Sequence, residues 1–484
     1  MRLRFCSLGL PLVAAILFAI SANSQSTADH IHAVETKLSS GEAISGHPRQ
    51  LMNLTERMTY HHVPGASIAV IHRGKIEWAH GYGVQDIGGE PVTTDTLFSA
   101  ASISKTVTAL AVLRLAQEGK IDLDASVNSY LKEWKIPDNQ FTAQRPVTTR
   151  ELLNHTSGIG ESLGAIYKPS EMPTLTQMLN GEQPAKNAAV RVKMVPGTKF
   201  EYANDGYLVL QALIVDVTGK PFAEALRGLV LVPLDMNHST FEAPLPLQDA
   251  KHAASAYGGK ATRGLPPEQF GQPNQAAGGL WTTPTDLAKV ILEIENAYAG
   301  RPHRLLTQKT ARMMLTPGMG FSDVLHWGLG IELGGKPSRP FLDHGGSAVY
   351  ESYMISYLDG DGVIVMTNST AGFHIYQELL TSVASVYDWP DFRTAEHKIF
   401  PIELKELDKF VGTYGFIRVT NSSDNLQCEV LSEGKQMRMY ASSPTHFFVL
   451  DASNEFDFTP GTTGDMTALR FITPTFSLML PRSK

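Results

Sequence analysis

The chain has 484 residues, more than a single hydrophobic core usually holds, so more than one domain is expected. An apolar content of 43% and a charged content of 18% exclude a disordered or fibrous chain. The net charge of −7 and the lack of a dense Lys/Arg tract argue against nucleic acid as a partner.

Residues 1–24 are typical of a signal peptide, so we expect an exported protein, periplasmic or secreted. Arg2 and Arg4 give a positive start, the uncharged run 8–20 is mostly apolar, and 22–24 supplies the small residues of a cleavage site. The apolar run is too short for a comfortable transmembrane helix. A retained anchor is therefore the less favoured alternative, and no transmembrane anchor is expected after cleavage.

The next segments predict a hairpin followed by helices. Two apolar-rich runs within 66–85 flank a turn at 73–75, which indicates a β-hairpin. Apolar residues recur at helical spacing over 107–115, and Gly119 is suited to end that helix. The middle of the chain, about 120–310, consists mainly of predicted helices joined by loops that contain proline and glycine.

Strands return after the helical region. Apolar-rich runs at 326–333, 351–358 and 362–368 predict them, and a further helix is expected at 375–389. Strands at both ends of a helical centre predict one sheet built from both ends of the chain. We assign residues 25–390 to this two-lobed domain.

The composition changes after residue 390. From residue 408 onward, short runs alternate apolar and polar residues with turn signals between them, which predicts a small antiparallel barrel or sandwich at 400–484. Cys428, the one cysteine outside 1–24, lies within such a run. We expect a buried, inert thiol and no internal disulfide.

Ser102 and Lys105 are the first candidates for chemistry, because they directly precede the predicted helix at 107–115. A serine hydroxyl is a weak nucleophile and needs an adjacent base, and residues three apart share one face of a helix. A helix N-terminus also favours developing negative charge. Ser-x-x-Lys nevertheless arises by chance in many long chains, so the pair alone favours a surface cap beside a solvated lysine.

Two further motifs follow, Tyr-x-Asn at 202–204 and His-Gly-Gly-Ser at 344–347. Singly, each has a structural explanation: a core tyrosine, an asparagine N-cap, a loop histidine and a glycine turn or bulge. In this order, the three motifs resemble the penicillin-recognising serine hydrolases, most closely the branch of class C β-lactamases, D-specific carboxypeptidases and aminopeptidases, and related esterases. The resemblance covers roughly residues 50–385 and extends to the stretches 97–127, 148–159, 196–211 and 276–290.

The resemblance implies an α/β (α+β) fold in which an antiparallel sheet is flanked by helices and accompanied by an all-helical lobe. The segment 408–414, "DKFVGTY", is similar to the start of the β domains that some of these hydrolases carry, so the C-terminal domain is expected to be lipocalin-like. No cofactor is required.

The resemblance also implies roles for the motif residues. A carbonyl substrate would acylate Ser102. Lys105 and Tyr202 would take a proton from the serine hydroxyl and deliver one to the leaving group, and later they would activate water for deacylation. Asn204 would orient Lys105 and hold amide groups of the substrate.

The His-Gly-Gly-Ser motif would complete the same site. The backbone N–H groups of Ser102 and Ser347 would form an oxyanion hole. Gly345 and Gly346 would let the strand approach the substrate closely. His344 stands where β-lactamases of this type usually carry lysine, and it is more similar to the D-peptidase and esterase members. Because histidine is largely neutral above pH 7, efficient β-lactam hydrolysis is not favoured.

We therefore expect an exported serine hydrolase that cleaves an amide or ester through an acyl-Ser102 intermediate. Peptides containing a D-residue are the first expected substrate class, and small esters are the second. A β-lactamase, or a slowly turning-over penicillin-binding or sensor protein, is the alternative. The expected partner is a small molecule or short peptide, and the sequence leaves the oligomeric state open.

A competing serine, Ser162, lies in a Gly-x-Ser-x-Gly pattern at 160–164. That elbow needs a buried strand immediately before it, whereas a predicted helix end and turn precede it here. We interpret this segment as a loop near the site. No metal site is expected, because none of the 16 histidines lies in His-Glu-x-x-His, and His61, His62 and His155 lack carboxylate partners at ligand spacing.

Overall fold

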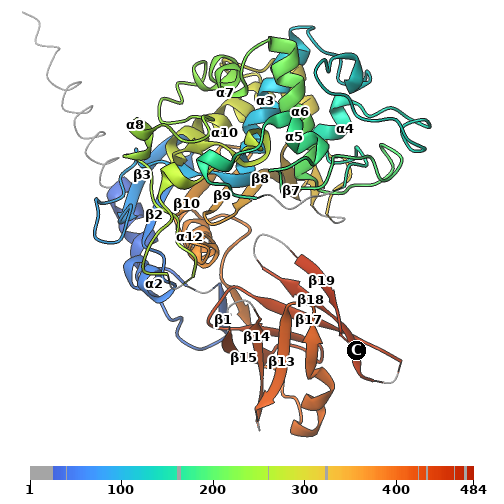
Figure 1. Ribbon diagram of the computed structural model, residues 1–484. Coiled ribbons are helices and arrows are strands. Elements are labelled where there is room, and N and C mark those ends of the chain that lie inside the picture. The colour runs from blue at the N-terminus through green and yellow to red at the C-terminus, as the bar shows by residue number, and fades with distance from the viewer. Residues whose placement is uncertain are drawn as a thin grey trace, which may run out of the picture. The chain divides into compact units, whose positions relative to one another are not determined.

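The chain forms two compact units (Figure 1). The sheet unit is Met58–Tyr376, and the barrel unit comprises Met1–Arg57 with Gln377–Lys484. The predicted signal peptide at 1–24 lies outside the described residues, and the predicted boundary at 390–400 stays a prediction. The structure, a computed structural model, describes residues 26–39, 41–160, 165–259, 261–321, 325–422, 424–431, 434–462, 464–473 and 477–483.

An antiparallel sheet runs through the sheet unit in the strand order β3-β2-β10-β9-β8-β7-β6 (Figure 1). Strand β10 pairs with β2, which confirms the prediction of one sheet built from both ends of the chain. The strands are β2 (Gly65–His72), β3 (Lys75–Gly83), β6 (His326–Trp327), β7 (Glu332–Lys336), β8 (Arg339–Ser347), β9 (Glu351–Tyr357) and β10 (Asp361–Thr367).

The central strands are covered on both faces. Every residue of β9 is buried, as is every residue of β10 after Asp361. Such continuous apolar strands are typical of the interior of a sheet. Helix α10 (Pro284–Ala299) packs against β2, β3 and β10.

One detail of the strand prediction is wrong. The run 326–333 was expected to be one strand, but it divides into β6 and β7. A turn separates them, in which the N–H of Gly328 donates to Ile331 O at 2.9 Å and Gly330 has φ +82°. The His-Gly-Gly-Ser motif at 344–347 forms the end of β8.

The region between β3 and β6 is mainly helical, as predicted (Figure 1). Helix α3 (Ser104–Gln117) is buried without a break from Ser104 to Leu113, because other elements surround it. The predicted helix end is correct, since Gly119 adopts φ +70° just beyond α3. A short strand pair, β4 (Phe98–Ser99) with β5 (Trp281–Thr282), also lies in this region. Its other helices include α4 (Thr149–Leu153), α5 (Leu175–Asn180), α6 (Asn204–Thr218), α7 (Phe222–Leu226), α8 (Leu247–Ala250), α9 (Gln275–Gly278) and α11 (Gln308–Met314).

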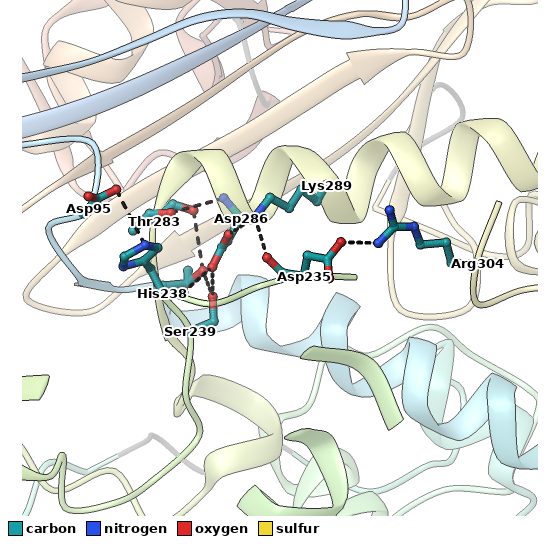
Figure 2. Close-up of polar contacts among 9 residues, drawn as sticks. Asp95, Asp235, His238, Ser239, Thr283, Asp286, Lys289 and Arg304 are labelled. Atoms are coloured by element: carbon teal, nitrogen blue, oxygen red, sulfur yellow. Dashed lines mark hydrogen bonds and ion pairs between the residues drawn. The ribbon is translucent and has the colours of Figure 1, made fainter. Parts of the chain in front are cut away.

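Asp286 joins the start of α10 to the preceding loop (Figure 2). Its backbone N–H donates to the N-cap Thr283 at 3.1 Å, and its carboxylate accepts hydrogen bonds from Ser239 Oγ at 2.8 Å and Lys289 Nζ at 2.7 Å. A carboxylate in the first helical turn is also favoured by the helix dipole. These contacts fix the N-terminus of the helix that packs on the sheet.

The barrel unit contains an antiparallel sheet in which β12 to β19 follow one another in chain order. An isolated bridge between Tyr414 and Arg482 joins the first strand to the residue after the last one, so the sheet nearly closes into a barrel. Cys428 is buried inside it, as predicted, and burial raises the pKa of its thiol to about 12. The strands are β12 (Gly412–Tyr414), β13 (Ile417–Ser422), β14 (Asn425–Val430), β15 (Lys435–Ala441), β16 (His446–Val449), β17 (Glu455–Pro460), β18 (Met466–Ile472) and β19 (Ser477–Pro481).

A parallel strand pair also belongs to the barrel unit, formed by β1 (Glu42–Ile44) and β11 (Ala395–His397). Further helices are α2 (Leu54–Tyr60) and α12 (Gly372–Val386), and residues 26–36 are also helical. In the portion of the chain that the structure describes, no helix combines the length and apolarity needed to cross a bilayer.

Candidate active site

Ser102 lies in the short turn η1 (Ala101–Ile103), directly before α3. Ala101 has a φ of +45°, a conformation that costs a non-glycine residue about 1–3 kcal/mol. The hydroxyl of Ser104 holds this turn, because it donates to Ala101 O at 2.6 Å and accepts from the N–H of Leu280 at 3.0 Å. The turn presents Ser102, partly exposed, at the start of a buried helix.

Lys105 is fully buried one helical turn further on. Its Nζ donates to Ser102 Oγ and to the backbone oxygen of Ala277, each at 3.0 Å. The same nitrogen lies 4.9 Å from the ring centre of Tyr202 and 5.6 Å from that of Tyr207. A buried amine needs such acceptors, so the lysine is directed at the serine.

Tyr202 is held in an aromatic cluster. Its ring lies 4.4 Å from that of His155 and 5.6 Å from that of Trp327. His155 Nδ1 accepts the N–H of Ala203 at 3.2 Å, so in the neutral ring the proton is on Nε2. Burial holds the pKa of His155 well below its ordinary value, and the nearby Lys105 acts in the same direction. His155 is therefore a neutral wall for the tyrosine.

Asn204 is the first residue of α6, whose N-cap is Ala203, so Asn204 is not itself the cap. The backbone oxygen of Asn204 accepts from Asn274 Nδ2 at 3.2 Å. Asn274 in turn caps α9 by accepting the N–H of Ala277 at 3.3 Å. This chain of contacts links the Tyr-x-Asn motif to the carbonyl that Lys105 binds.

His344 lies near the end of β8 and is only 3% exposed. Its Nδ1 lies 2.7 Å from Gly345 O and donates to it, which places the proton of the neutral ring on Nδ1. Burial, with a further contribution from Lys105, lowers the pKa of His344 to about 3. The ring also lies edge-on to Trp327 at 5.3 Å. His344 therefore supplies no positive charge at neutral pH.

The two glycines of the motif have different surroundings. A Cβ on Gly346 would lie 2.2 Å from Ala100 O, so β8 approaches the segment before Ser102 more closely than a side chain would allow. A Cβ on Gly345 would find its nearest atom, in the Tyr353 ring, at 3.8 Å. Only Gly346 is required for the approach of β8 to η1.

Ser347 ends β8 and is exposed, opposite Glu351 in the register with β9. Its Oγ donates to Glu351 Oε1 at 2.6 Å. Burial raises the pKa of Glu351 to about 8, although the hydrogen bond from Ser347 opposes this shift. At neutral pH the carboxyl mostly keeps its proton.

These contacts bring Ser102, Lys105 and Tyr202 together, and Gly346 places the end of β8 beside them. Ser162 lies outside the described residues, and the side-chain role of Asn204 stays a prediction. The sequence did not reveal that Lys105 binds the carbonyl of Ala277 or that the ring of Trp327 packs against Tyr202 and His344. No sequence signal marks either residue, because a backbone oxygen has no residue type and the tryptophan is distant in sequence.

A family model described as Beta-lactamase matches residues 52–387, most of the chain and all of the site. This chain belongs to the Beta-lactamase family. Members of the family are serine hydrolases built on the β-lactamase fold, so the family accounts for the antiparallel sheet and the helical region together.

Relatives within the family differ in how much they share with this chain. Penicillin-binding protein 4* of Bacillus subtilis (strain 168) is 22% identical over 439 residues, covering 85% of this chain and 94% of that protein. Protein flp of Staphylococcus aureus (strain MW2) is 31% identical over 201 residues, covering 40% of this chain. The chain spans 38% of the length of that relative.

Solved structures share the fold. The octameric penicillin-binding protein homologue from Pyrococcus abyssi superimposes with a TM-score of 0.60 at 22% identity, covering 88% of this chain and 96% of that one. D-amino acid amidase from Ochrobactrum anthropi SV3, complexed with L-phenylalanine amide, gives a TM-score of 0.56 at 23% identity, covering 74% and 99%. At this identity the likeness shows the fold alone.

Proposed function

We propose that this protein is an exported serine hydrolase that cleaves an amide or ester through an acyl-Ser102 intermediate. The observation that carries the proposal is the 3.0 Å contact between Lys105 Nζ and Ser102 Oγ, made by a fully buried lysine at the entrance of a helix. A base within hydrogen-bond reach is what a serine nucleophile needs.

In the proposed acylation, Lys105 takes the hydroxyl proton as Ser102 Oγ attacks the substrate carbonyl. The negative charge that develops on the carbonyl oxygen is met by the backbone N–H groups of Ser102 and Ser347, since preorganised donors stabilise such an oxyanion. The close approach of β8 that Gly346 permits supports this assignment, because it brings the end of β8 to the nucleophile turn.

Collapse of the tetrahedral intermediate breaks the bond to the leaving group. Tyr202, beside the Lys105 amine, passes a proton to the departing amine or alcohol. Water then attacks the acyl-enzyme and gives its proton back through the same pair, which releases the acid and restores the serine hydroxyl. The neutral, packed ring of His155 supports Tyr202 in this position.

The neutrality of His344 supports a D-residue amide or peptide, or a small ester, as the substrate. A β-lactam substrate carries a carboxylate that a lysine at this position would attract, whereas a buried histidine with a pKa of about 3 offers no cation. D-amino acid amidase shares the fold, which is compatible with the first class. A β-lactamase or a slowly turning-over penicillin-binding protein is the alternative.

Turnover of a matched substrate panel tests the proposal. We expect repeated hydrolysis of D-phenylalanine amide or p-nitrophenyl acetate, slower hydrolysis of L-phenylalanine amide, and loss of all activity in S102A. The S162A variant is the matched serine control and should remain active. Activity that survives in S102A contradicts the proposal, and a stoichiometric penicillin adduct without turnover of any substrate favours the penicillin-binding alternative.

Export is proposed on the composition of residues 1–24 and has its own test. N-terminal sequencing of the protein recovered from the periplasm or medium of an expressing bacterium should start near residue 25. A protein that stays in the cytoplasm with its original N-terminus contradicts export, while leaving the chemistry of Ser102 unaffected.

A further inference from the structure

Four ionisable side chains converge within the barrel unit, from four different strands. Glu42 comes from β1, His397 from β11, His446 from β16 and Glu455 from β17. His397 Nε2 lies 2.6 Å from Glu42 Oε2 and 3.9 Å from Glu455 Oε2. His446 Nε2 lies 2.6 Å from the same oxygen of Glu455. One oxygen or nitrogen from each of Glu42, His397 and Glu455 lies within 4.8 Å of the others.

The surrounding strands and rings fix these side chains in place. In the parallel pair β1–β11, Glu42 is the partner of Ala395 and so lies diagonal to His397 on the same face. In the antiparallel pair β16–β17, His446 is the partner of Asp457 and so lies diagonal to Glu455. Phe448 stacks on the ring of His397 at 4.3 Å. The side chains of Glu42 and His397 are only 6% and 14% exposed, so this cluster is not a mobile surface group.

The ligand types define the cation that would fit. Two carboxylates and a neutral imidazole match the charge and ligand preferences of a divalent transition metal such as Zn²⁺, whereas Ca²⁺ and Mg²⁺ prefer oxygen alone. Ligand atoms around tetrahedral Zn²⁺ lie about 3.3 Å apart, given metal–ligand bonds of about 2.0–2.1 Å. The two distances from His397 Nε2, 2.6 and 3.9 Å, lie on either side of that value, and all three ligand atoms lie within 4.8 Å of one another, so modest side-chain shifts would form the site.

We propose that Glu42 Oε2, His397 Nε2 and Glu455 Oε2 bind a divalent transition-metal ion of the zinc class. His446 is a positioning residue, which holds the bound oxygen of Glu455 through its Nε2. Water completes the coordination. Because the ligands come from β1, β11 and β17, the ion ties the parallel strand pair to the barrel strands, and the site is independent of the Ser102 chemistry.

Metal binding by the untagged, full-length chain tests this proposal. After treatment with a chelator and buffer exchange, equilibrium dialysis should recover one Zn²⁺ per chain at micromolar free metal, and Co²⁺ should give visible absorption bands typical of nitrogen and oxygen ligands. Zinc should also raise the thermal midpoint of unfolding, since a ligand that binds the folded state stabilises it.

Three variants and one control locate the site. H397A and the isosteric E42Q should lose stoichiometric binding, and H446A should weaken it roughly 10–100-fold, as removal of an outer partner typically does. H303A, which removes an exposed histidine of the sheet unit, should bind as the wild type does. Circular dichroism establishes that each variant is folded, and E42Q keeps the test decisive if H397A unfolds.

Two outcomes overturn the proposal. One is the absence of saturable zinc binding by the wild type. The cluster would then be a set of ion pairs and hydrogen bonds between histidine and carboxylate side chains that binds no metal. The other is zinc binding in folded E42Q that matches the H303A control.

Discussion

At the scale of single residues, Lys105 is defined by what surrounds it. Its amine contacts the Ser102 hydroxyl and the Ala277 carbonyl, and the rings of Tyr202 and Tyr207 lie beside it. The sequence predicts the first of these contacts from a spacing of three residues. It could not predict the carbonyl contact, which joins residues 172 positions apart.

Replacement of Lys105 tests its role as the base. Both K105A and K105R should lower kcat/KM for p-nitrophenyl acetate by about 10²–10⁴-fold, because a guanidinium stays protonated and cannot accept the serine proton. K220A removes a lysine from an exposed pair with Glu224 and should change little. A K105R enzyme that keeps more than about a tenth of the activity argues against proton transfer through this amine.

Glu351 links the same region to the stability of the fold at different pH values. Burial raises its pKa to about 8 in the folded state, against an ordinary value of 4.5. Between these values the folded protein holds the extra proton, so this residue's contribution to the free energy of unfolding is complete below pH 4.5 and falls as the pH rises through 8.

The E351Q variant removes this titration and keeps a neutral side chain at the position. In urea unfolding at pH 5 and pH 9, the variant should gain stability relative to the wild type at pH 9, on the order of a few kcal/mol. If the free energy of unfolding of both proteins changes equally between pH 5 and pH 9, the pKa of Glu351 is not raised in the folded state.

At the scale of elements, β8 and η1 form the site by their close approach. The substitution G346A places a methyl group 2.2 Å from Ala100 O, so backbone must move. We expect a loss of about 1–3 kcal/mol of stability and a lower thermal midpoint. G345A is the matched control for stability, because its methyl group meets its nearest atom at 3.8 Å. Equal midpoints for the two variants would contradict this packing.

Helices and strands were predictable from sequence to the extent that their pattern was local. The helical spacing at 107–115 indicated α3, although the helix begins earlier, at Ser104, directly after the turn η1. The run 326–333 was misread as one strand, since its apolar residues continue through a glycine turn. The pair β1–β11 was missed because three residues carry too little pattern, and their partners are distant in sequence.

At the scale of the whole molecule, the sequence predicted the class of each region but not how distant segments meet. Strands at both ends of a helical centre predicted one sheet built from both ends of the chain, which the pairing of β10 with β2 confirms. Regular alternation predicted the C-terminal antiparallel sheet. The closure between Tyr414 and Arg482 depends on register, which alternation alone leaves open. The proximity of Glu42 to Glu455 also depends on how distant strands meet, so the sequence pattern could not predict it.

The proposed hydrolysis requires that Ser102 is acylated during turnover. Rapid acid quenching of the enzyme with p-nitrophenyl acetate, followed by intact-mass measurement and peptide mapping, tests it most directly. We predict one added acetyl group per chain, located on Ser102, formed slowly in K105R and absent in S102A. An acetyl group mapped to another serine, or an adduct that persists in S102A, would contradict the account.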